Sequence, residues 1–142
     1  MALARNEYVK KLPPGYYGIH GMAIMMRFGV VKGTVGEIFV KQNFGSAKNI
    51  VSYKTSRQAV GDLLKNRIDL LIHDAPIILM LAAEYANRGL AELPSLLSEE
   101  YLAWGIRKND VKLLEAANNF VDMMIKEGKL DPIINRWIPF KN

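Results

Sequence analysis

The stretch at residues 30–39, VVKGTVGEIF, changes character across Lys32, Gly33 and Thr34. The valines before this turn are typical of a buried strand, and apolar residues after it recur at helical spacing. Thr34 is suited to accept a hydrogen bond from a first-turn amide, and Glu37 is placed to reach back, as in a capping box. The stretch therefore predicts a strand, a tight turn and a helix over residues 35–43.

The same order repeats along the middle of the chain. Strands are expected at residues 28–31, 49–53 and 68–73, and helices at 56–66 and 75–89. The run at 68–73, IDLLIH, is continuously apolar, as in a strand that is buried on both faces of a parallel sheet. Alternating strands and helices form right-handed βαβ units, so the pattern predicts an α/β fold with a mainly parallel sheet.

The flanking regions carry weaker patterns. Residues 1–17 are expected to be irregular, because Pro13, Pro14 and Gly15 interrupt any continuous helix. Apolar runs predict further strands at residues 19–26 and 101–107. A long helix is expected at 111–127, opened by Asp110 and closed by Gly128, and a short one from Asp131 and Pro132 onward.

Composition excludes several classes of function. The 142 residues are 50% hydrophobic and carry a net charge of +5, but the basic residues are scattered and indicate a solvated surface rather than a nucleic-acid interface. No cysteine is present, and the two histidines lack partners at metal-ligand spacing, so neither a disulfide nor a metal site is expected. No apolar run is long enough to cross a membrane, and no signal peptide is visible.

Two turns at the carboxyl ends of expected strands carry the candidate binding residues. At residues 32–37 the free amides and the positive end of the helix dipole suit a carboxylate or a phosphate, although a plain helix cap explains the same residues. The turn matches neither nucleotide-binding glycine motif, and no cofactor is expected. At the second turn, Asp74 is either an N-cap or an acceptor for a ligand ammonium, with His73 packed beside it. Together the turns suit a zwitterion such as an amino acid.

Longer strings carry a family resemblance. The segments GVVKGTVGEIFVKQNF, IVSYKTSRQAVGDLLKNRIDLLIHDAPIILMLA and SEEYLAWGIRKNDVKLLEAANNFVDMMIKEGKLDPIINRWI resemble the second lobe, return strand and C-terminal helices of type II periplasmic solute-binding proteins of the polar amino-acid branch. The resemblance implies that Thr34, with Gly33 and Val35, receives the ligand carboxylate and that Asp74 receives its ammonium. The string ARNEYVKKLPPGYY further implies that Arg5 clamps the carboxylate.

The resemblance also implies that most of the first lobe is absent. The chain is then one three-layer lobe: an irregular segment at 1–17, a binding lobe with hinge strands at 18–107, and C-terminal helices at 108–142, within a single domain. In the family those helices pack on the missing lobe. The apolar stripe between Leu113 and Ile125 must therefore fold back or pair with another chain, for example in a homodimer through the hinge strands or the C-terminal helix.

Three functions follow as hypotheses. The first is an amino-acid half-site with weak or vestigial binding, derived from a transporter's periplasmic or extracellular binding protein. The second is a structural single-lobe unit that homodimerises and binds no ligand. The third is an enzyme, since some relatives are dehydratases, but Glu37, Asp74, Glu84 and His73 are the only acids and bases near the turns and no nucleophile–base pair is evident. A non-catalytic binding module is therefore expected.

Overall fold

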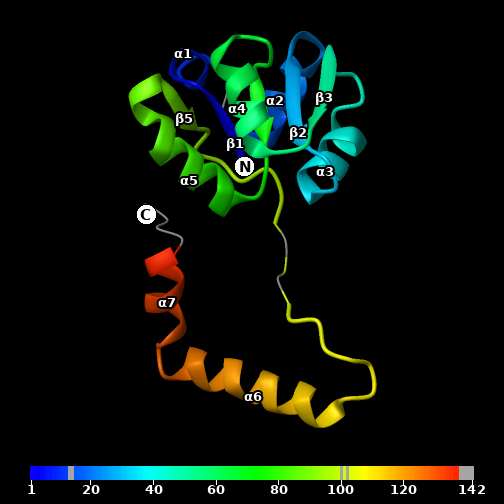
Figure 1. Ribbon diagram of the computed structural model, residues 1–142, viewed down its shortest axis with the longest axis vertical. Coiled ribbons are helices and arrows are strands. Elements are labelled where there is room, and N and C mark those ends of the chain that lie inside the picture. The colour runs from blue at the N-terminus through cyan, green and yellow to red at the C-terminus, as the bar shows by residue number, and fades with distance from the viewer. Residues whose placement is uncertain (13–14, 100, 102, 138–142) are drawn as a thin grey trace. The chain divides into compact units, whose positions relative to one another are not determined.

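The structure is a computed structural model that describes residues 1–12, 15–99, 101 and 103–137. The chain divides into two compact units, Met1–Glu99 and Glu100–Asn142. The first unit holds one sheet with helices on both faces, and the second holds two helices (Figure 1).

The first unit contains a single five-stranded sheet in the order β3-β2-β4-β1-β5. β2 (Arg27–Val31) pairs in parallel with β3 (Asn49–Tyr53) and with β4 (Leu70–Ile72). β1 (Ala2–Arg5) pairs antiparallel with β4 and with β5 (Leu90–Glu92). The α/β class is confirmed and the parallel part matches the prediction, but the sheet as a whole is mixed.

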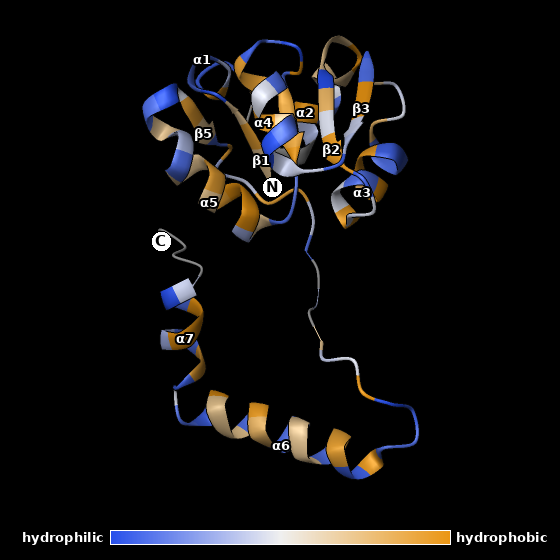
Figure 2. Ribbon diagram, in the orientation of Figure 1, coloured by the Kyte–Doolittle hydropathy of each residue, from blue (hydrophilic) through white to orange (hydrophobic). Residues whose placement is uncertain are grey.

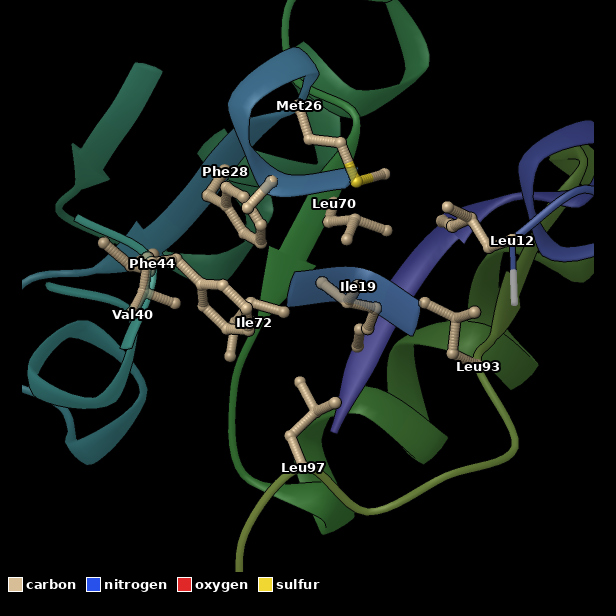
Figure 3. Close-up of a cluster of buried hydrophobic side chains, with 14 residues drawn as sticks. Leu12, Ile19, Met26, Phe28, Val40, Phe44, Leu70, Ile72, Leu93 and Leu97 are labelled. Atoms are coloured by element: carbon tan, nitrogen blue, oxygen red, sulfur yellow. The ribbon is translucent and has the colours of Figure 1, made fainter. Parts of the chain in front are cut away.

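The core lies in two layers, one on each face of the sheet. Alternate strand residues face opposite sides, as the pleat requires: Leu70 and Ile72 join one cluster, while Leu71 joins the other. The first cluster packs against α2 (Gly15–Met22) and α3 (Val35–Asn43) and includes a stacked pair of rings, Phe28 and Phe44, 5.0 Å apart (Figure 3). The second packs against α4 (Ser56–Leu64) and α5 (Ala75–Tyr85).

The helices α3, α4 and α5, each of which follows a parallel strand, are the three that the helical spacing of apolar residues predicts. α3 spans the predicted residues, and α4 and α5 begin where predicted. Thr55 caps α4 by accepting a hydrogen bond from the Gln58 amide at 3.3 Å. A short 3₁₀ helix, η2 (Ala86–Arg88), follows α5 and ends at Gly89, whose φ of 80° is the left-handed conformation that favours glycine.

The N-terminal predictions are wrong in two places. Residues 2–5 form the buried strand β1, followed by a short helix α1 (Asn6–Val9), where an irregular segment was expected. The predicted strand at 19–26 is instead the end of α2 and a 3₁₀ turn, η1 (Ala23–Met25). Ile19, Ala23 and Met26 are buried whereas Ile24 and Met25 are exposed, so the burial follows a helical repeat.

The predicted strand at 101–107 is also wrong, since the described residues there form no strand. Tyr101 is fully exposed. One edge strand of the sheet is β5, which no pattern in the sequence predicts. It is short and is held by β1 through the pair Ala4 and Ala91.

The second unit consists of α6 (Val111–Lys126) and α7 (Leu130–Trp137). Asp110 caps α6 by accepting from the Leu113 amide at 3.2 Å, as predicted, and Gly128 adopts a φ of 65° after its end. Figure 2 shows apolar and polar residues alternating along α6. No described residue of either helix is buried.

Candidate functional site

The two candidate turns lie at one edge of the sheet, beyond the carboxyl ends of neighbouring strands. β2 and β4 are parallel partners with Val30 opposite Ile72. The first turn follows β2 and leads into α3, and the second follows β4 and leads into α5. In open α/β sheets this edge is the usual place for a ligand. The structure therefore brings Thr34 and Asp74 to the same rim, as the spacing predicts.

The turn before α3 is a capped helix start. Gly33 has a φ of 79°, a conformation that glycine adopts without a Cβ penalty. The Thr34 hydroxyl donates to the Val31 carbonyl at 2.7 Å and accepts from the Glu37 amide at 3.4 Å. The amides of Val35 and Gly36 lie in the first turn of α3, where a helix has no internal acceptor for them. These amides and the helix dipole favour an anion at this point.

Glu37 completes the cap from a buried position. Its carboxylate accepts from the Gly33 amide at 2.8 Å, from the Ser52 hydroxyl at 2.6 Å and from the Lys41 ammonium at 2.9 Å. The Thr34 half of the predicted capping box is thus present, but Glu37 bonds the Gly33 amide rather than the amide of the cap residue itself. These hydrogen bonds, led by that from Ser52, lower the pKa of Glu37 from 4.5 to about 2. The sequence pattern indicated Glu37 but held no signal for Ser52.

Gly36 brings the start of α3 close to the end of β4. A Cβ at this residue would lie 3.0 Å from the Ile72 carbonyl oxygen and 3.4 Å from the Cα of His73. Only a glycine allows the helix and the strand to approach this closely without displacement. The two turns of the rim are therefore in direct contact through the backbone.

Asp74 occupies the N-cap position of α5, but its side chain makes no cap hydrogen bond. Its carboxylate is 51% exposed and lies 3.6 Å from Nδ1 of His73. The alternative that Asp74 serves only as a cap therefore loses its main support. An exposed carboxylate on this rim is available to a ligand cation.

His73 is buried beside Asp74. Its Nδ1 accepts the Asp74 amide hydrogen at 2.8 Å, so the neutral ring carries its proton on Nε2. Burial lowers the pKa of His73, opposed by the nearby Asp74 carboxylate. The ring is thus neutral near pH 7, and it is a packed neighbour of the rim rather than a charged group on it.

Arg5 does not lie with the other candidates. β1 runs antiparallel to β4, with Ala4 opposite Leu70, so Arg5 lies toward the other edge of the sheet. Its guanidinium donates to the carbonyls of Leu63 and Ile68 at 2.7 and 2.9 Å, and it stacks 4.7 Å from the Tyr8 ring. These contacts give Arg5 a structural role, in contrast to the predicted carboxylate clamp.

Within residues 1–12, 15–99, 101 and 103–137, no group of three or more His, Asp or Glu side chains is arranged to hold a metal ion. In the same part of the chain, no helix is both long and apolar enough to cross a membrane.

Comparison with solved structures identifies the fold. A putative binding component of an ABC transporter from Wolinella succinogenes, complexed with lysine, superposes with a TM-score of 0.82 at 24% identity, over 96% of this chain and 57% of that one. The chain has the fold of amino-acid ABC-transporter binding proteins. The predicted resemblance to type II periplasmic binding proteins is thereby confirmed at the level of fold.

Two further structures agree. An amino-acid ABC transporter substrate-binding protein from Streptococcus pneumoniae, bound to L-arginine, matches with a TM-score of 0.70 at 24% identity over 99% of this chain and 57% of that one. An ancestral amino-acid-binding protein, a precursor of cyclohexadienyl dehydratase, matches with a TM-score of 0.70 at 24% identity over 96% and 57%. The chain thus spans just over half the length of these structures. No family model matches the sequence.

Proposed function

We propose that this chain is a non-catalytic solute-binding lobe whose rim forms a half-site for a free amino acid. The proposal rests on one observation: the N-terminus of α3 and the Asp74 carboxylate lie on the same rim, and that carboxylate is exposed and makes no cap hydrogen bond to α5. The α-carboxylate would bind the first-turn amides of α3 near Thr34, Val35 and Gly36. The α-ammonium would bind Asp74.

The charges of the rim support this assignment. The α3 terminus has its acidic residue, Glu37, already neutralised by Lys41 at 2.9 Å, so the dipole is left to attract an external anion. Asp74 has no Lys or Arg ion pair among the described residues, and the neighbouring His73 has a lowered pKa. The ammonium group of Met1 lies near this turn, where it donates to the His73 carbonyl at 3.1 Å. Structures with this fold bind lysine and arginine.

Binding by this half-site should be weak. An ammonium paired with a carboxylate that remains half exposed stays hydrated, and such surface pairs contribute little free energy. Tight small-molecule sites bury most of the ligand surface, which a single rim does not do. A periplasmic or extracellular location is part of the proposal and rests on the fold relationship alone.

Calorimetry and NMR titration with L-lysine, L-arginine and glycine test the proposal. We expect dissociation constants weaker than about 1 μM, and a further loss of affinity in Asp74→Asn. Asp110→Asn is the matched control, because Asp110 caps α6 and belongs to neither turn of the rim. Binding that is equal in Asp74→Asn and wild type would refute the half-site. Sub-micromolar binding abolished by Asp74→Asn would show a complete site instead.

The exposed apolar face of the second unit favours a second candidate function. Leu113, Phe120 and Ile125 are each about half exposed on α6, although an apolar stripe normally packs against something. Under this alternative the chain is a structural unit that homodimerises and binds no ligand. Sedimentation equilibrium decides between the two: a dimer that Phe120→Glu dissociates supports the alternative, and a monomer at high concentration opposes it.

A further inference from the structure

We propose that Glu37 is a positioning residue, which holds residues 33–36 in the conformation that receives a ligand carboxylate without itself touching the ligand. This inference rests on the proposed function, because it concerns the same rim. The binding residues expected from the sequence include neither Glu37 nor its partner Ser52.

The contacts of Glu37 join three separate parts of the fold. One carboxylate oxygen, Oε2, accepts from the Gly33 amide at 2.8 Å, which ties α3 to the turn that precedes it. The other, Oε1, accepts from the Ser52 hydroxyl of β3 at 2.6 Å and from Lys41 one turn along α3 at 2.9 Å. A turn with a glycine at positive φ is otherwise free to adopt several conformations. The carboxylate restricts that freedom at Gly33, in addition to the bonds from Thr34 to the Val31 carbonyl.

The same contacts determine which amides remain for a ligand. Gly33 already donates to Glu37, so its amide is not available, contrary to its predicted role as a ligand contact. The Thr34 hydroxyl hydrogen is likewise directed to the Val31 carbonyl. The amides of Val35 and Gly36 are left at the start of the helix. Lys41 offsets the charge of Glu37, so that the internal carboxylate does not repel an external one.

A first experiment measures the order of the turn without any ligand. The solvent-exchange rate of the Gly33 amide is followed by NMR in wild type, Glu37→Ala, Glu37→Gln and Val40→Ala. Val40 is a fully buried core residue on the same helix, so Val40→Ala lowers stability without touching the turn. We expect exchange about tenfold faster in Glu37→Ala than in Val40→Ala, with partial rescue in Glu37→Gln, which retains an acceptor oxygen.

A second experiment measures binding with L-lysine as the probe. The dissociation constant is obtained from the lysine-induced chemical-shift changes of the Val35 and Gly36 amides. We expect Glu37→Ala to raise it about fivefold and Val40→Ala to leave it unchanged. Equal weakening in the two variants would show that Glu37 acts only through stability and would overturn the inference. If Glu37→Ala does not fold, Ser52→Ala removes one of the three bonds and should shift both readouts in the same direction; no shift would overturn the inference.

The two experiments separate the inference from the proposed function. An unchanged Gly33 exchange rate in Glu37→Ala would overturn the inference whatever the ligand result. The absence of any lysine-induced shift in wild type would refute the proposed function. Faster Gly33 exchange in that case would still support Glu37 as the residue that orders the turn.

Discussion

The two rim residues should respond differently to the same substitution, because only one of them caps its helix. Thr34→Ala removes a hydroxyl that accepts from the Glu37 amide at 3.4 Å and donates to the Val31 carbonyl at 2.7 Å. Asp74→Ala removes a carboxylate that makes no cap hydrogen bond and is 51% exposed. A sequence-based argument that treats both as N-caps predicts equal losses.

The expected magnitudes follow from these contacts. Loss of a threonine N-cap costs about 1 kcal/mol, and the Val31 carbonyl keeps its bond from the Thr34 amide at 3.2 Å, so no buried acceptor is orphaned. For Asp74→Ala only a weak interaction with the helix dipole is lost, about 0.5 kcal/mol or less. For a unit the size of Met1–Glu99, the first change corresponds to roughly 4–8 °C in Tm.

Urea unfolding followed by far-ultraviolet circular dichroism measures both changes. Thr34→Ser, which retains the hydroxyl, is the control for the first variant, and Asp74→Asn, which removes only the charge, is the control for the second. We expect Thr34→Ser to lie close to wild type and Thr34→Ala to lose about 1 kcal/mol. Equal losses of unfolding free energy in Thr34→Ala and Asp74→Ala, or a larger loss in Asp74→Ala, would refute the assignment. Asp74 would then stabilise α5 as a cap instead of being a carboxylate that is available to a ligand.

Three further predictions concern the charges and packing of the first unit. Because the pKa of Glu37 is lowered to about 2, the free energy of unfolding should fall as the pH falls from 4.5 toward 2, and pH-dependent urea unfolding of Glu37→Gln should lack this component. Gly36→Ala should lower Tm, because the added Cβ would lie 3.0 Å from the Ile72 carbonyl oxygen. Gly61→Ala should raise Tm, because a Cβ at Gly61 would have no neighbouring atom within 4 Å and alanine favours the helix. Asp69→Ala should cost about 3 kcal/mol in urea unfolding, because it leaves the Arg27 guanidinium without its partner.

The middle of the fold could be predicted because its signals are local. Each helix that follows a parallel strand has its N-cap position, its apolar repeat and its ending within a few residues, and the run at 68–73 has three consecutive apolar residues at its centre. The capping box of Thr34 and Glu37 is a local pattern for the same reason. The structure confirms these elements, although β4 is limited to Leu70–Ile72.

The missed elements depend on contacts between distant residues. β1 is only four residues long, and it is a strand because β4 and β5 pair with its two sides. At residues 19–26 two exposed apolar residues, Ile24 and Met25, concealed a helical repeat. The antiparallel direction of β1, which carries Arg5 toward the other edge of the sheet, is likewise not encoded nearby.

The site divides in the same way. The positions of Thr34 and Asp74 at one rim follow from two local motifs and the rule for parallel strands. Whether an N-cap position is actually used as a cap is not local, since Asp74 and Thr55 occupy equivalent positions and only Thr55 bonds its helix. The bond from Ser52 to Glu37 spans 15 residues and two elements.

The central claim is that the rim recognises the two charged ends of a free amino acid. An NMR titration with L-lysine, its Nα-acetyl derivative and its methyl ester tests this most directly, since each derivative lacks one of the two charges. We expect saturable chemical-shift changes at the Val35, Gly36 and Asp74 amides with L-lysine, and much smaller changes with either derivative. Equal shifts with all three compounds, or no shifts at these amides with L-lysine, would contradict it.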